Sequence, residues 1–172
     1  SGSTLTGATL AGADLTNATV VSVTLTGANL AGATLTGTNL ASSNLSSTDL
    51  DGADLTGATA TSTNLTGADL TDTNLTDADL TNATISSATL LRTNLTGADL
   101  SSVTGTSAIL TSVAATGSTL AFANLTGSTL LHGSFAGANM LMTHLDTATI
   151  TNTNFTNVTG PYTTWTSATL WN

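Results

Sequence analysis

Residues 51–80 read DGADLTGATATSTNLTGADLTDTNLTDADL, and Leu recurs in this stretch at every fifth position except position 60. The series continues in both directions, without insertion or deletion, from Leu5 to Leu170. It contains 34 positions, here called the centres, of which 30 are large and apolar and 23 are Leu. Such strict repetition predicts an architecture in which every five-residue unit has the same conformation. The smaller centres are Ala60, Gly105, Ala115 and Gly160.

Each repeat has a small residue two positions before the centre and a turn-forming residue two positions after it. Ala fills 17 of the 34 small positions, and Gly, Ser, Asn or Asp fills 28 of the 34 turn positions. An α-helix would spread such centres around its circumference, and a flat strand would point alternate centres to opposite faces. A short extended segment points the small residue and the centre inward together, provided that the chain bends once per repeat at the turn residues. The sequence therefore predicts a coil with the centres inside and their two neighbours outside.

The small positions also indicate how the interior is packed. Val occupies four of them, and three of these, Val103, Val113 and Val158, precede a shrunken centre. If the small residue and the centre share one close-packed interior, a larger small residue is expected where the centre has lost its large side chain. Chance remains the alternative for three cases.

The pattern Ala-(Asp/Asn)-Leu-x-x, as in Ala13-Asp14-Leu15 and Ala28-Asn29-Leu30, resembles that of the pentapeptide-repeat family over residues 4–170. The resemblance implies an all-β fold, a right-handed quadrilateral β-helix with four repeats per coil and about 8.5 coils of 20 residues. It implies no shared catalytic residues. The best-understood subgroup of the family resembles double-stranded DNA in shape and charge, dimerises and acts on DNA gyrase. On this fold one side of the coil carries a core ladder formed by Leu10, Leu30, Leu50, Leu70, Leu90, Leu110, Leu130, Ile150 and Leu170.

The sequence also departs from the common pattern of that family. Thr often stands in place of Asp or Asn before the centre, as at Thr9 and Thr34, and the C-terminal end is rich in aromatic residues. That end resembles the tails of secreted bacterial members, which favours an extracytoplasmic location over the cytoplasm. We expect residues 4–172 to form a single domain, and Ser1-Gly2-Ser3 to be a remnant of cloning.

Composition excludes several classes of function. The net charge is −9 with one Arg and no Lys, so direct binding of nucleic acid, which needs clustered basic residues, is not expected. The absence of Cys excludes disulfides and thiolate metal sites, and no apolar run approaches the roughly 20 residues that span a membrane. Since a regular rod offers no concave pocket, we expect neither enzymatic activity nor a cofactor.

Large apolar side chains occupy normally polar outer positions in the C-terminal half. Residues 20 apart share an outer row, which predicts two apolar rows one side of the coil apart. Clustered exposed apolar groups are typical of interfaces, so these rows predict a homodimer with two-fold symmetry. The alternative is that they shield the end of the rod. The first row contains Phe122, Met142 and Tyr162, with Leu141 beside it, and the second contains Leu91, Leu131 and Trp171.

The ionisable residues allow two interpretations. Seven of the ten acids lie between Asp49 and Asp79, which suggests either a DNA-like charged surface or a solvated wall. On a four-sided coil these acids spread over at least three faces, which favours the wall. Arg92 is expected to lie over Asp72 in a surface pair that contributes at most about 1 kcal/mol. His132 and His144 are expected on different sides of the rod, as surface residues without a metal or a catalytic role.

Thr-Leu-Thr and Asn-Leu-Thr triplets, as at residues 24–26 and 64–66, predict outer ranks of hydroxyl and methyl groups. Similar ranks occur in β-helical ice-binding proteins, although Thr also favours extended backbone generally, and Ala114, Ala136 and Asp146 interrupt the ranks.

Three hypotheses for the function follow from the sequence. The first is a non-catalytic structural or protein-interaction module, exported from a bacterial cell, whose protein partner is unknown. The second is a cytoplasmic DNA mimic directed at gyrase, and the third is an ice-binding protein.

Overall fold

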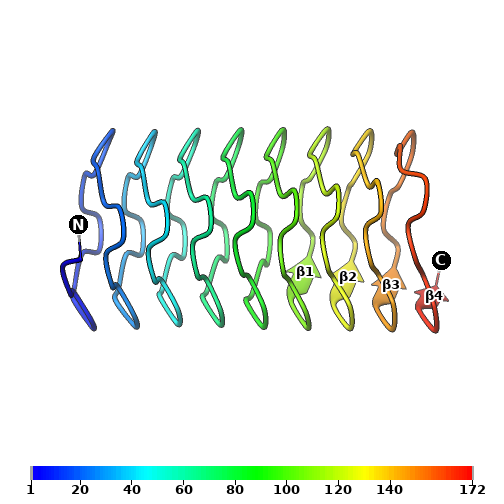
Figure 1. Cartoon of the computed structure of the whole chain (residues 1–172), viewed down its shortest axis with the longest axis horizontal. Coiled ribbons are helices and arrows are strands. Elements are labelled where there is room, and N and C mark those ends of the chain that lie inside the picture. Colours follow the sequence, from blue (N-terminus) through cyan, green and yellow to red (C-terminus); the bar gives the residue numbers. More distant parts are fainter. Residues whose placement is uncertain (1, 172) are drawn as a thin grey trace.

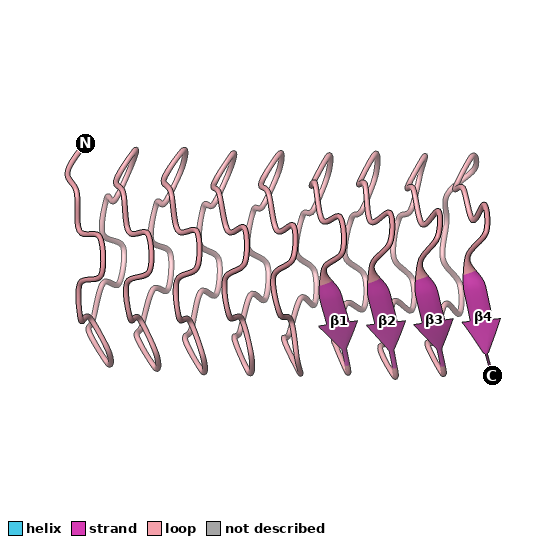
Figure 2. Cartoon of the chain, turned by 90° about the horizontal axis from the view of Figure 1, so that it is seen from below, coloured by secondary structure: helices cyan, strands magenta, loops and turns pink. Residues whose placement is uncertain are grey.

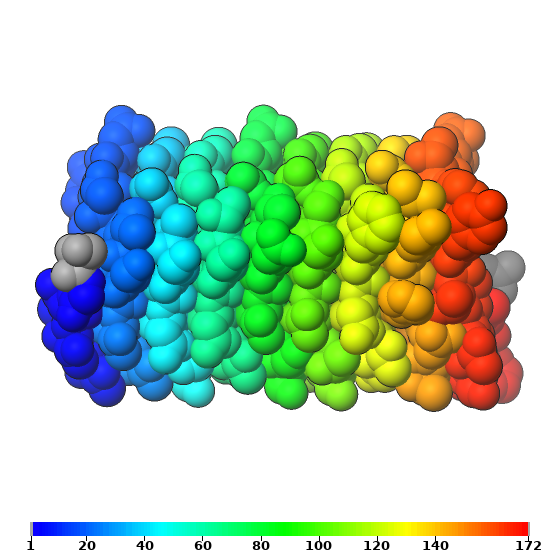
Figure 3. Space-filling view, in the orientation of Figure 1, coloured from blue at the N-terminus to red at the C-terminus, as the bar shows by residue number. Residues whose placement is uncertain are grey.

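The computed structural model describes residues 2–171 as a rod of coils stacked along one axis, with the N- and C-termini at opposite ends (Figure 1). Parallel bridges join residues 20 apart along the rod, from Thr4 and Thr24 to His144 and Thr164. The predicted period of four pentapeptides per coil is therefore confirmed. In the space-filling view the coils form successive bands along the rod (Figure 3).

One side of the rod has enough regular pairing in its C-terminal part to form strands. These are β1 (Ile109–Thr111), β2 (Thr129–Leu131), β3 (Thr149–Thr151) and β4 (Thr169–Trp171), which form one parallel sheet in this order (Figure 2). In register, Leu110 pairs with Leu130, and Leu130 pairs with Ile150. The flanking residues in these strands are mostly β-branched or large and apolar, which suits extended backbone.

Backbone N–H groups donate most of the hydrogen bonds between coils, and the repeat around one centre shows the pattern. Around the centre Leu30, the N–H of Asn29 donates to the preceding coil, at Ala8 O (2.8 Å), and that of Leu30 donates to the following coil, at Asp49 O (2.7 Å). The N–H of the turn residue Gly32 also donates to the following coil. The turn itself is closed by the N–H of Ala33, which donates to Leu30 O at 3.0 Å. Four of the five donors are thus satisfied by backbone.

The fifth donor explains why Asp or Asn so often precedes the centre. The N–H of Ala31, which follows the centre Leu30, donates to the side-chain Oδ1 of Asn29 at 2.9 Å. The same bond recurs at other coils, for example from Thr71 to Asp69 and from Thr96 to Asn94. Since an unpaired backbone donor is costly away from water, these side chains complete the hydrogen bonding of the repeat.

The interior contains the centres and the small residues, as predicted. Both are buried in every repeat from Val23 to Ile150. Where Thr replaces Ala at the small position, its hydroxyl donates to the carbonyl of a centre in the preceding coil, as from Thr73 to Leu50 at 2.8 Å. Among residues 2–171 no buried side-chain N or O atom lacks a hydrogen-bond partner.

The space left by shrunken centres is filled from neighbouring coils. A Cβ built at Gly105 would lie 2.8 Å from Leu125 Cδ2 and 3.0 Å from Ile85 Cγ1. Val103 and Val113 are buried, as expected. The space beside Gly105, however, is filled by Ile85 and Leu125, the centres of the two adjacent coils. A second compensation was not predicted: Gly133 occupies the small position beside the largest buried centre, Phe135.

The core ladder is buried over most of its length. Its members from Leu30 to Ile150 are at most 4% exposed, and Leu10 is half-buried. Leu170 is 62% exposed, so its assignment to the buried core is wrong. The physical reason is that a centre is covered by the centres 20 residues before and after it, and Leu170 lies in the final described coil.

Replacing Leu70 with Asp should destabilise the rod by about 4 kcal/mol or more, because an unpaired carboxylate would enter the packed interior. The matched control is Thr66→Asp, which places the same charge on the outside and should change stability by less than about 0.5 kcal/mol. Urea unfolding followed by circular dichroism measures both. Comparable midpoints for the two variants would contradict the inward and outward assignment.

Asn94→Ala removes the acceptor of the Thr96 N–H and of the Thr96 hydroxyl, and the two bonds that Asn94 Nδ2 donates to Asn74 and Thr76 in the preceding coil. We expect a loss of about 1–3 kcal/mol in the free energy of unfolding. Thr84 occupies the equivalent position, and Thr84→Ala, which removes none of these bonds, serves as the control. Equal losses would show that the side-chain acceptor is unimportant.

Candidate interaction surfaces

Every turn position from Gly2 to Ser167 has a positive φ. This left-handed conformation is easy for Gly, tolerated by Asn and Asp, and costs other residues about 1–2 kcal/mol. Large side chains nevertheless occupy it at Arg92 and His132 and, as large apolar groups, at Phe122 (φ 62°), Met142 (φ 53°) and Tyr162 (φ 66°). Since the repeat readily accepts Gly here, a row of large apolar side chains at these strained positions is a candidate for a role outside folding.

These three turn residues form the first predicted row, here called the apolar corner. Their coils are stacked, because the N–H of Phe122 donates to Leu141 O and that of Met142 to Pro161 O. Phe122 is 52% exposed, Met142 40% and Tyr162 75%, and Leu141 beside them is half-buried. The apolar corner is thus a continuous exposed strip along the C-terminal coils.

The second predicted row lies farther away than expected. The apolar corner belongs to the turn after the centres Leu120 and Met140, whereas Leu131 and Trp171 follow the centres of the opposite side. Two complete pentapeptides separate the turn after Leu120 from the turn after Leu130, so the second row lies in the strands beside the diagonally opposite corner, and the prediction that the rows lie one side apart is wrong. Leu91 and Leu131 are half-buried, and Trp171 is 68% exposed. One flat interface cannot contain both rows.

The C-terminal end contains an aromatic cluster that sequence reasoning missed. Phe135 and Phe155 stack with ring centroids 5.5 Å apart, and Trp165 contacts Phe155 edge-on at 5.6 Å. The 20-residue spacing of the two Phe centres was the available signal. Beside them lies an open hollow of about 460 Å³ without a titratable side chain in its lining, which consists of Ile150, Thr153, Phe155, Trp165, Leu170 and Trp171.

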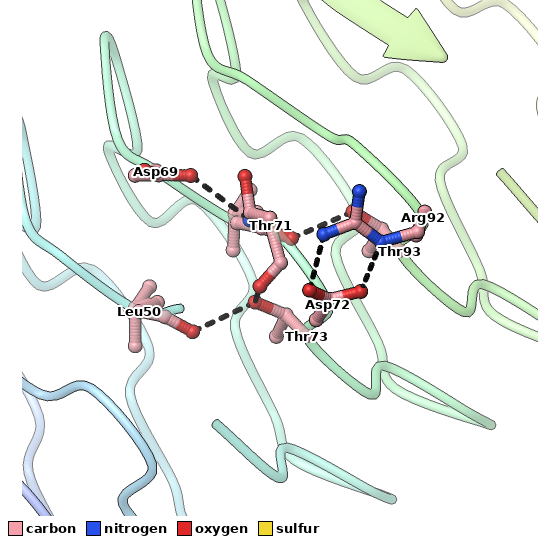
Figure 4. Close-up of polar contacts among 8 residues, drawn as sticks. Leu50, Asp69, Thr71, Asp72, Thr73, Arg92 and Thr93 are labelled. Atoms are coloured by element: carbon pink, nitrogen blue, oxygen red, sulfur yellow. Dashed lines mark hydrogen bonds and ion pairs between the residues drawn. The ribbon is translucent and has the colours of Figure 1, made fainter. Parts of the chain in front are cut away.

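The acids are dispersed around the coil, as predicted. Asp49 and Asp69 stack on one side, Asp79 and Asp99 on the opposite side, and Asp54 lies on a third. Arg92 lies over Asp72, as predicted, and its Nε donates to Asp72 Oδ1 at 2.6 Å (Figure 4). This hydrogen bond holds the pKa of Asp72 below its ordinary value. The pair is half-exposed, so its contribution to stability is small.

The two histidines lie on different sides of the rod, as predicted. His144 Nδ1 lies 3.1 Å from Thr164 Oγ1 and 3.7 Å from Asp146 Oδ2. The hydroxyl of Thr164 donates to Asp146 and lowers the pKa of that carboxyl. Within residues 2–171 no group of three or more His or acidic side chains is arranged to hold a metal ion. His144 and Asp146 thus join their coil to the following coil through Thr164.

Comparison with known proteins gives a consistent result. A sequence profile described as "Pentapeptide repeats" matches eight copies, over residues 1–30, 21–57 and 63–101. HetL of the cyanobacterium Nostoc, a pentapeptide repeat protein involved in heterocyst differentiation regulation, is 26% identical, with a TM-score of 0.53 over 96% of this chain and 84% of HetL. QnrB1, a plasmid-mediated fluoroquinolone resistance protein, is 19% identical, with a TM-score of 0.69 over 98% of this chain and 87% of that chain. No curated protein sequence matches the chain significantly.

The strain at the apolar corner can be measured directly. Phe122→Gly and Phe122→Ala both remove the ring, but only Gly relieves the positive φ, so the Gly variant should be more stable by about 1 kcal/mol. At Leu131, which lies in β2 without a positive φ, the order should reverse and Ala should be the more stable substitution. Thermal unfolding of the four variants tests both orders. A less stable Gly variant at position 122 would refute the strain.

Proposed function

Because the chain belongs to the pentapeptide-repeat family and has that family's right-handed quadrilateral β-helix, we propose that it is a non-catalytic protein-interaction module. Its partner is a second copy of the same chain, bound through the apolar corner formed by Phe122, Met142 and Tyr162. The single observation that carries the proposal is that these three stacked, exposed side chains are large and apolar at left-handed turn positions where Gly would fold better and where most other turns have Gly, Ser, Asn or Asp.

The charge distribution favours a second copy at this corner. The chain carries net charge −9, so two copies repel one another over most of their length. Beyond Asp99, however, Asp146 is the only acid and there is no Lys or Arg. Two rods can therefore bring their C-terminal corners together with little electrostatic cost, and a two-fold axis buries the same apolar strip from each.

Several observations support a role without catalysis. The hollow at the C-terminal end is lined by aliphatic and aromatic side chains and Thr153, none of which titrates near neutral pH. HetL, another pentapeptide repeat protein, is involved in heterocyst differentiation regulation. The gyrase-directed DNA mimic is less well supported, because a mimic needs acids in one stripe and here they lie on several sides.

We also propose that the module acts outside the cytoplasm of a bacterial cell. Support comes from the Thr- and Ser-rich surface, the near absence of basic residues and the aromatic C-terminal end. In the part of the chain that the structure describes, no helix is long and apolar enough to cross a membrane. Antibody detection in the culture medium of the source organism tests this location, and confinement to the cytosolic fraction would refute it.

Sedimentation equilibrium tests the dimer. The wild-type chain, with a mass of 16.9 kDa, should sediment as a species of twice that mass. The combined variant Phe122→Ser, Met142→Ser and Tyr162→Ser should sediment as a monomer, since it removes the apolar strip while keeping a residue that the turn accepts.

The matched control is the variant Leu131→Ser, His132→Ser, which changes the opposite corner and should remain dimeric. Circular dichroism confirms that each variant is folded. A monomeric wild type at the highest soluble concentration, or dissociation of the control to the same extent, would overturn the proposal.

A further inference from the structure

One side of the rod carries no charge over seven successive coils. Its outer residues flank the centres Leu5 to Leu125 and are spaced 20 apart, from Thr4 to Asn124 in one rank and from Thr6 to Thr126 in the other. Every residue in both ranks is Thr, Ser or Asn. We call this surface the neutral face. The three interruptions that the sequence suggested lie elsewhere: Ala114 and Ala136 on the opposite side, and Asp146 in the next coil.

The neutral face is flat and periodic. The first rank is joined by parallel bridges from coil to coil without a break, from Thr4–Thr24 to Thr104–Asn124. Residues in a rank are therefore about 4.8 Å apart, the two ranks are about 6.5 Å apart, and the face is roughly 30 Å long. At the edge that follows the second rank the turn residues are Gly or Ser, as at Gly27, Ser47 and Gly67, so no large side chain projects above the face there.

Contacts between the ranked side chains make the face rigid. The hydroxyls of Ser86 and Thr106 lie 3.0 Å apart, and Asn64 Nδ2 donates to Asn44 Oδ1 at 3.1 Å. Thr is also stiff at χ1 because it is branched at Cβ. These contacts and the restricted χ1 of Thr limit side-chain motion on the face, which lowers the entropic cost of binding.

The opposite side has a similar number of Thr residues but a different chemistry. There several hydroxyl protons are donated to a carboxylate or amide oxygen next to the centre: Thr56 donates to Asp54 at 2.6 Å and Thr76 to Asn74 at 2.7 Å. On the neutral face the hydroxyls of Thr24, Thr66, Thr84 and Thr104 have no protein partner within the described chain, so they are available to an external ligand.

We propose that the neutral face binds ice. A ligand that fits it must be flat, uncharged and periodic, and must offer hydrogen bonds at a spacing close to that of the hydroxyls. The face has no aromatic or Arg side chain, which are the usual anchors for a protein partner or for stacking a sugar ring. It also lacks the charged groups that would hold liquid-like hydration shells against a crystal of water. This inference is independent of the proposed dimer, because it concerns other residues.

Partition of the whole chain into slowly growing polycrystalline ice tests the proposal, together with thermal hysteresis. The wild type should concentrate in the ice and produce hysteresis. Thr66→Tyr and, in a separate coil, Thr26→Tyr place a bulky ring on the neutral face and should abolish both effects. The control is Thr81→Tyr, which makes the same change at the equivalent position of another side and should leave both unchanged.

Thermal unfolding confirms that all variants are folded. Exclusion of the wild type from ice would overturn the proposal, as would an equal loss in the Thr66→Tyr and Thr81→Tyr variants. Binding to crystalline cellulose or chitin without partition into ice would also overturn it, and would assign the face to a polysaccharide. The monomer–dimer equilibrium should be the same in the Thr66→Tyr variant as in the wild type, so the two proposals fail separately.

Discussion

The left-handed turn residue at every fifth position is the constraint on which the rest of the structure depends. It makes each repeat bend in the same direction, so that four repeats close one coil and residues 20 apart stack. The remaining features of the pentapeptide follow. A small side chain is needed where the chain enters the interior, and Asn or Asp before the centre supplies the acceptor for the one N–H that the backbone leaves unpaired, as Asn29 does for Ala31.

This constraint determines which residues can occupy the interior, whereas the outer residues can vary. Each coil contacts only its neighbours, so an outer residue can change without affecting the path of the chain. The four sides consequently carry different chemistry on the same backbone, as the comparison of Thr66 with Thr76 shows. Membership of the family therefore explains the rod, and function has to be argued from individual faces.

The sequence alone predicts which side chains point inward and which outward. A five-residue period excludes an α-helix and a flat strand, so the chain has to bend once per repeat. The number of sides of the coil does not follow from this pattern, because it depends on the turn angle. The prediction of four sides came from the family resemblance. Once 20 residues per coil were assumed, the pairing of Arg92 with Asp72 followed. Leu170 was misplaced because its burial requires a further coil over it, and Trp165 was missed in the aromatic cluster because it reaches Phe155 from the opposite side of the coil.

The two proposed surfaces also have a geometric relation. The apolar corner runs from Phe122 to Tyr162, whereas the neutral face runs from Thr4 to Thr126, so the two surfaces share only the coil that contains Phe122. Pairing through the corner thus leaves most of each neutral face uncovered and gives a dimer with two of them. If the two-fold axis turns both faces toward one plane, a single crystal surface can engage both at once, and the second contact forms at a high effective concentration. The large side chains of the apolar corner would then strengthen the binding of ice by holding two neutral faces together.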